Sequence, residues 1–169
     1  MLGDVTLDGS RWRIGSASFS NPRRAIVART HEEVRASVQA AEAEARSGHW
    51  VVGYIGYDAA PGFNMRLKVR GTSSLPLVWF GVYDAPVEGG HSRERVSVGP
   101  WEASMSQKEH ADAVASIRRS IEKGDTYQAN LTFAMTADFS GDAASLFADM
   151  VRSQRRSYAA LIDLGTNQV

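Results

Sequence analysis

Two stretches of the 169-residue chain, Trp50–Tyr57 (WVVGYIGY) and Leu75–Tyr83 (LPLVWFGVY), decide its fold class. Each is apolar on both faces, which is typical of sheet strands that are covered from two sides. Each is also far shorter than the roughly 20 residues that a membrane-spanning helix needs. The sequence therefore predicts two core strands and no membrane partner.

Three segments around these strands combine capping signals with apolar residues at helical spacing. Thr30 with Glu33, and Ser106 with Glu109, have the spacing of a capping box. The predicted helices cover residues 31–47, 107–123 and 142–153. Shorter apolar runs predict further strands at 25–28, 95–98 and 158–164. Helices isolated between sheet-rich stretches favour an α+β fold, with antiparallel sheets and packed helices, over a doubly wound one.

The segment Tyr127–Phe139 follows the second predicted helix and alternates strictly along its length. We expect one long strand whose apolar side packs into a core. Its other side carries Gln128, Asn130 and Thr132. From the residues alone, this row of polar groups fits a solvent-facing strand and a hydrogen-bonding cleft about equally well.

Charge and composition exclude several kinds of site. Nineteen Lys and Arg balance nineteen Asp and Glu, so no positive field favours nucleic acid. The lack of cysteine excludes disulfides, thiolate nucleophiles and cysteine-ligated metals. The four histidines are too scattered in sequence to predict a metal site, and the N-terminus does not resemble a signal peptide. We expect a soluble, cytoplasmic protein without a nucleic-acid partner.

The last residues predict an incomplete hairpin. A strand at 157–164 is followed by the turn Gly165–Asn167, and Gln168–Val169 has the form of the start of a return arm. Proteins normally cover or charge such an unpaired edge. We therefore expect these residues to be the front part of a longer protein.

Several blocks of the sequence, in order, resemble the chorismate-utilising enzymes. The most specific is GDTYQANLT (124–132), which follows the helical stretch AVASIRRSIEKG (113–124). The others are Asn21-Pro22 before AIVA, GHWVVGYIGYDAAPGF (48–63), LPLVWFGVYDAP (75–86) and SYAALIDLG (157–165). The form YQxNLT is more similar to the aminodeoxychorismate synthases, the branch that aminates chorismate, than to the anthranilate synthases.

The resemblance implies the N-terminal portion of component I of such an enzyme, with an aminodeoxychorismate synthase-like, chorismate-binding fold. Residues 1–104 would form a sheet-rich region, and residues 105–169 the beginning of the chorismate-binding catalytic region. The implied substrate is chorismate, aminated to 4-amino-4-deoxychorismate for p-aminobenzoate and folate synthesis. The implied partners are a glutamine amidotransferase subunit that supplies ammonia and the remainder of component I.

The resemblance also implies where the reacting groups lie. The nucleophilic lysine, the acid–base carboxylate and the Mg²⁺ ligands of the family would follow residue 169, so we expect these residues to hold no cofactor and to be inactive alone. Relatives that add water to chorismate carry a lysine base where this chain has Gln128, and aminating relatives carry glutamine. A neutral amide can orient ammonia or substrate without removing a proton. Gln128 is therefore expected to position substrate or ammonia, with Asn130 and Thr132 as supporting substrate-binding residues.

Two other functions stay open. Anthranilate synthase component I is the rival enzyme, and its products would be anthranilate and pyruvate. A non-catalytic binding or docking module is the rival from another class.

Overall fold

The computed structural model describes residues 5–8, 17–69, 74–88, 94–154, 158–164 and 169. They form two compact units, one made of residues 1–93 with 143–169 and the other of residues 94–142. The first unit contains β1 (Val5–Asp8), β2 (Ala17–Phe19), β3 (Arg24–Ala28), α1 (His31–Arg46), β4 (Trp50–Ile55), the 3₁₀ turn η1 (Tyr57–Ala59), α2 (Ala60–Phe63), β5 (Val78–Tyr83), β6 (Val87–Glu88), α4 (Ala143–Gln154) and β11 (Ala159–Ile162). The second contains β7 (Ser97–Val98), β8 (Glu102–Ala103), α3 (Gln107–Glu122), β9 (Met135–Thr136) and β10 (Phe139–Ser140).

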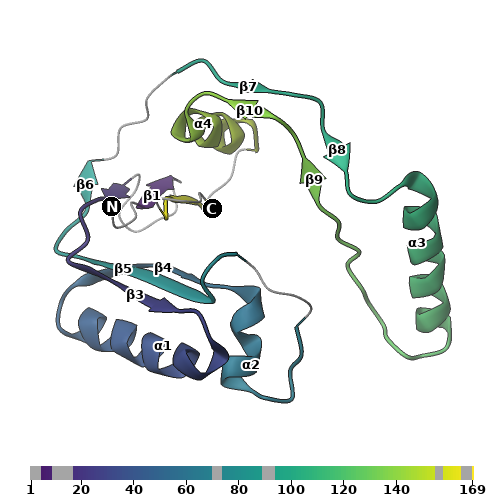
Figure 1. Cartoon of the computed structure of the whole chain (residues 1–169), viewed down its shortest axis with the longest axis horizontal. Helices are drawn as coiled ribbons and strands as arrows, with labels where there is room; N and C mark the ends of the chain where they lie inside the picture. Colours follow the sequence, from purple (N-terminus) through teal and green to yellow (C-terminus); the bar gives the residue numbers. More distant parts are fainter. Residues whose placement is uncertain (1–4, 9–16, 70–73, 89–93, 155–157, 165–168) are drawn as a thin grey trace. The chain divides into compact units, whose positions relative to one another are not determined.

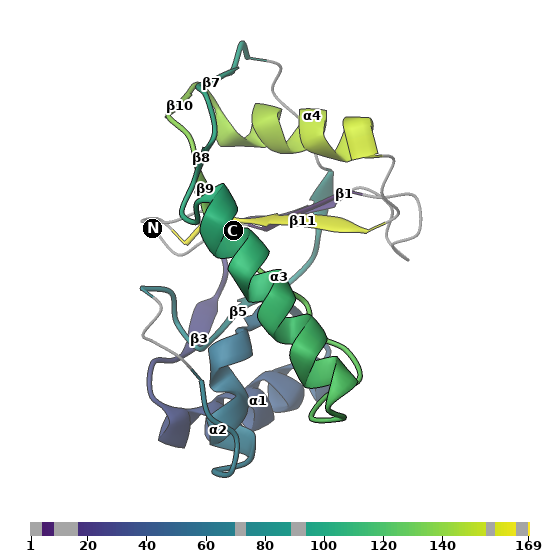
Figure 2. The same ribbon diagram turned by 90° about the vertical axis from the view of Figure 1, so that its right-hand side faces the viewer.

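The first unit is layered (Figure 1). Helix α1 packs against an antiparallel sheet with strand order β3-β5-β4. A second antiparallel sheet, with order β11-β1-β2-β6, covers the other face of that sheet, and α4 lies over the second sheet (Figure 2). This arrangement of antiparallel sheets with packed helices confirms the predicted α+β class.

Strand β5 is the centre of this unit and is covered from both sides, as its apolar run predicts. On one side, Val78 packs with Val34 of α1, and Val82 packs with Ala41, which lies about two helical turns further along α1. Val34 and Val78 are fully buried. One face of β5 therefore packs against α1. This contact explains why α1 has apolar residues along one side.

The other side of β5 joins the two sheets. Trp79 and Tyr83 pack there with Phe19 of β2 and Ile162 of β11. The ring centroids of Phe19 and Tyr83 lie 5.3 Å apart, a distance at which tilted aromatic rings attract each other. Together with the β1–β11 ladder, this cluster joins β11 to the N-terminal strands.

All three predicted helices form, with ends within two residues of their expected bounds. In α1, the carboxylate of Glu33 accepts hydrogen bonds from the backbone N–H groups of Thr30 and Arg29, at 3.1 and 2.7 Å. In α3, the carboxylate of Glu109 accepts from the Ser106 hydroxyl and backbone N–H, at 2.7 and 2.8 Å. These hydrogen bonds hold the pKa of each carboxyl group below its ordinary value.

The predicted turn 165–167 and Gln168 lie outside the described residues, but Val169 of the expected return arm pairs with β11. Ile162 N–H donates to the carbonyl of Val169 at 2.8 Å, and Val169 N–H donates to the carbonyl of Ile162 at 2.9 Å. Within the described ranges, no helix has both the length and the apolar character needed to cross a membrane.

The second unit shows where the prediction of a long strand is wrong. Of Tyr127–Phe139, only β9 and β10 are strands, each of two residues, and they pair with β8 and β7. Residues 127–134 have no regular secondary structure and join no strand ladder among the described residues. An alternating sequence separates an inner from an outer face only when neighbouring strands form a sheet. No described strand is paired with residues 127–134.

Candidate functional site

The candidate site is the segment 124–134, whose first end is fixed by the C-terminus of α3. Gly124 N–H donates to Ile121 O at 3.0 Å, and Asp125 N–H donates to Ser120 O at 2.9 Å. Gly124 has φ +80°, a left-handed conformation that glycine adopts without strain. The motif glycine therefore ends the helix and turns the chain into the segment that carries Gln128.

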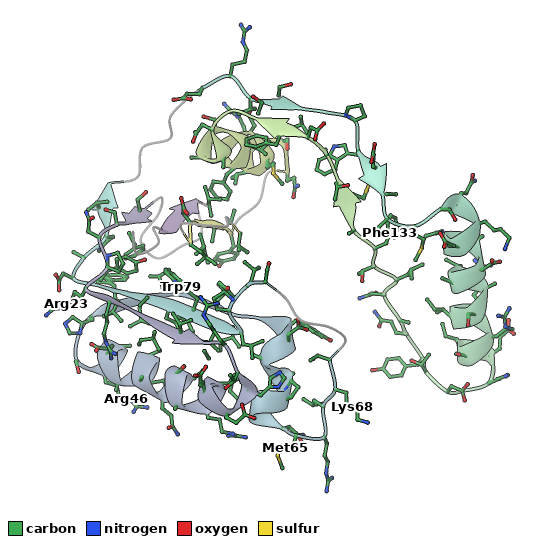
Figure 3. The ribbon with its side chains drawn as sticks, in the orientation of Figure 1. Arg23, Arg46, Met65, Lys68, Trp79 and Phe133 are labelled. Atoms are coloured by element: carbon green, nitrogen blue, oxygen red, sulfur yellow. The ribbon has the colours of Figure 1, made fainter. Side chains whose placement is uncertain are left out.

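The far end of the segment is fixed to the residues around β8. Ser104 N–H donates to Ala134 O at 2.9 Å, and Ala134 N–H donates to the Ser104 hydroxyl at 3.1 Å. Phe133 meets the ring of His110 edge to face, with centroids 5.9 Å apart, where α3 begins (Figure 3). Both ends of the segment are thus held by α3 or by residues that precede it.

Between these ends, the three predicted site residues lie on one irregular segment and line no pocket seen among the described residues. Gln128, Asn130 and Thr132 are all exposed, and Tyr127, on the side expected to be buried, is 93% exposed. In the described residues no sheet separates the two sides of the segment, so the expected inward-facing row of amides stays a prediction. Their roles at a reacting centre stay predictions.

A shallow hollow, widely open to solvent, runs along one side of α3 and was not predicted from the sequence. It has a volume of about 520 Å³ and is open to solvent. Its walls come from one side of α3: His110, Ala111, Val114, Ala115, Arg118, Arg119 and Glu122. The signal in the sequence is the four-residue spacing of His110, Val114, Arg118 and Glu122, which places them on one helix face. His110, Arg118 and Arg119 are all exposed.

In the first unit, a cluster of charged and polar side chains stabilises the fold. Glu44 of α1 accepts from the guanidinium of Arg24 in β3 at 2.7 and 3.0 Å. His49 Nδ1 lies 2.7 Å from the other Glu44 oxygen but makes no aligned hydrogen bond with it. Arg24 first, and His49 second, hold the pKa of Glu44 below its ordinary value. The cluster ties β3 to the end of α1.

Among the described residues, no three His, Asp or Glu side chains lie close enough together to hold a metal ion. The Mg²⁺ that the family resemblance implies therefore does not fit any group of residues seen here.

The comparison with known protein families identifies the family that this part of the chain matches. Residues 88–169 match the chorismate binding enzyme family. The chorismate-binding match includes α3, the hollow along it and the whole segment 124–134, together with α4 and β11. The resemblance that the motifs indicated is thereby confirmed.

A curated relative supports the same conclusion over more of the chain. The chain is 25% identical to aminodeoxychorismate synthase component 1 of Klebsiella aerogenes, over 70% of its own length and 32% of the relative. It thus spans about a third of the length of that relative. The chorismate-binding match begins at residue 88 and runs through both compact units, and the expected division into 1–104 and 105–169 stays a prediction.

Proposed function

We propose that this chain is part of an enzyme that aminates chorismate to 4-amino-4-deoxychorismate. The observation that carries the proposal is the motif GDTYQANLT, which lies inside the chorismate-binding match and presents Gln128 on a segment fixed at both ends. The likeness to an aminodeoxychorismate synthase component supports the choice of reaction.

The chemistry of Gln128 favours amination over hydration. Its amide offers a carbonyl acceptor and two N–H donors and has no basic nitrogen. It can therefore hold ammonia or a substrate hydroxyl in position by hydrogen bonds, whereas it cannot take a proton from water as a general base does. Asn130 and Thr132 lie two and four residues further along the same segment and add donors and acceptors for the substrate.

The proposed partners follow from the same reaction. A glutamine amidotransferase subunit supplies ammonia, and the remainder of component I supplies the nucleophilic lysine, the acid–base carboxylate and the Mg²⁺ site. The chemistry that Mg²⁺ would add is stabilisation of negative charge on the substrate. These 169 residues alone are then inactive, because they lack those groups.

Replacing Gln128 tests this function. In the enzyme that contains these residues together with the remainder of component I, Gln128→Ala should lower ammonium-dependent amination of chorismate about tenfold or more, since one orienting hydrogen bond is worth about 1.4 kcal/mol. The thermal midpoint should not change, because Gln128 is exposed. Gln39→Ala, at an exposed position of α1, is the matched control and should leave turnover unchanged. Equal turnover in the two variants would remove Gln128 from the reacting centre.

A further inference from the structure

The side chain of Thr126, in the motif GDTYQANLT, contacts the backbone of Gln128. Its hydroxyl donates a hydrogen bond to the Gln128 carbonyl at 2.9 Å. Thr126 is half-buried, whereas its neighbours Asp125 and Tyr127 are exposed. A local bond from a threonine hydroxyl to the backbone two residues away can hold a chain in one conformation outside helices and sheets.

This bond lies where backbone contacts of the segment are missing. The turn at the end of α3 is fixed by Asp125 N–H, which donates to Ser120 O at 2.9 Å. After it, residues 126–133 make no backbone-to-backbone hydrogen bond to another described residue. The Thr126 hydroxyl therefore extends the fixed geometry of the helix end as far as Gln128.

A bond to the Gln128 carbonyl restrains the direction of the Gln128 side chain. It fixes the peptide group that follows the Gln128 Cα, and with that group it limits the side-chain rotamers that the backbone allows. Threonine suits this role, because its β-branched side chain has few χ1 rotamers and loses little freedom when the bond forms. Positioning matters for rate, since a displacement of about 1 Å can cost as much as 100-fold.

We propose that Thr126 is a positioning residue for Gln128: its hydroxyl holds the Gln128 backbone so that the side-chain amide meets ammonia or substrate in one orientation. This inference rests on the proposed function, in which the Gln128 amide positions one of these groups. Thr126 acts through Gln128 and touches no reacting atom. Thr126→Val isolates the hydrogen bond, because it keeps the β-branched shape and removes the donor.

Steady-state kinetics test the proposal in the enzyme that contains these residues together with the remainder of component I. Thr126→Val should lower ammonium-dependent amination of chorismate about fivefold, the factor that corresponds to a net hydrogen bond of about 1 kcal/mol. The loss should fall on the same constant, kcat or KM, that Gln128→Ala changes. Thr126→Ser keeps the hydroxyl, so this matched control should stay within about twofold of the wild type.

Combining Thr126→Val with Gln128→Ala separates positioning from a general effect on the fold. In the Gln128→Ala background, Thr126→Val should change turnover by less than about twofold, because the side chain that it positions is gone. The thermal midpoint should be the same in each of these proteins, since the hydrogen bond lies on an exposed segment outside the buried core.

Three results would overturn this inference alone. Thr126→Val with wild-type turnover, beside an impaired Gln128→Ala, would remove the positioning role and leave the proposed function intact. An equal loss from Thr126→Val in both backgrounds would mean that the hydroxyl acts elsewhere. A loss that comes with a lower thermal midpoint would give the hydroxyl a structural role. Gln128→Ala with wild-type turnover would instead overturn the proposed role of Gln128, and this inference with it.

Discussion

Gly53→Ala is expected to destabilise the first unit by about 3 kcal/mol, at the upper end of the cost of overpacking. A Cβ at this position would lie 2.0 Å from Trp79 O and 2.7 Å from Phe80 Cα. Both are backbone atoms of β5, to which β4 is hydrogen-bonded in register Gly53 to Phe80. They cannot move aside as a flexible side chain would, so the ladder between β4 and β5 has to open.

Urea unfolding monitored by tryptophan fluorescence measures this effect, because Trp50 and Trp79 lie in the paired strands. Gly99→Ala is the matched control: its added Cβ would have no neighbour closer than 3.5 Å, an ordinary contact distance. The control should change stability by less than about 0.5 kcal/mol. If Gly53→Ala unfolds at the urea concentration of the control, the close approach of β4 to β5 is wrong.

Phe19→Ala should cost about 3–5 kcal/mol, the range for removing a buried aromatic ring. Phe19 is 1% exposed and packs against Tyr83 and Trp50, with ring centroids 5.3 and 5.7 Å away. It fills the space between the two sheets, so its loss leaves a cavity where β2 contacts β5. The near-ultraviolet circular dichroism of Tyr83 and Trp50 should weaken at the same time, because these rings lose their fixed neighbour.

Phe139→Ala provides the comparison for Phe19, since Phe139 is an aromatic residue of a strand but is 43% exposed. Its truncation should cost about 1 kcal/mol or less, because little apolar surface leaves the interior. Equal losses for the two variants would contradict the stacking of the two sheets through Phe19.

The helices and strands that could be predicted from the sequence are those whose formation depends on residues close together in the chain. Helix α1 begins where Thr30 and Glu33 form a capping box, and α3 begins at Ser106 and Glu109. Strand β5 could be predicted because covering both faces leaves an apolar residue at nearly every position. In each case the pattern and the contact that explains it lie within one element and its immediate neighbours.

The features that could not be predicted depend on contacts between distant parts of the chain. The sequence does not say that β2 and β11 pack on Trp79, since the cluster brings together Phe19 and Ile162, which are 143 positions apart. Nor does the alternation of Tyr127–Phe139 say whether a neighbouring strand exists, and without one both sides of the segment are exposed.

The family to which the candidate segment belongs could be predicted from the sequence, but the conformation of the segment could not. The motif GDTYQANLT indicated the chorismate-utilising family, and the family match includes it. Its residues were expected in a cleft, however, and the hollow found nearby is lined by α3 instead, with Arg118 and Glu122 among its walls. Helical spacing alone does not distinguish a hollow from an ordinary solvated face.

The most direct test of the proposed function is the product that the natural protein containing these residues forms from chorismate, ammonium and Mg²⁺. Chromatography with authentic standards should find 4-amino-4-deoxychorismate, and the purified 169 residues alone should form none. Anthranilate with pyruvate, or no consumption of chorismate by the natural protein, would contradict the account.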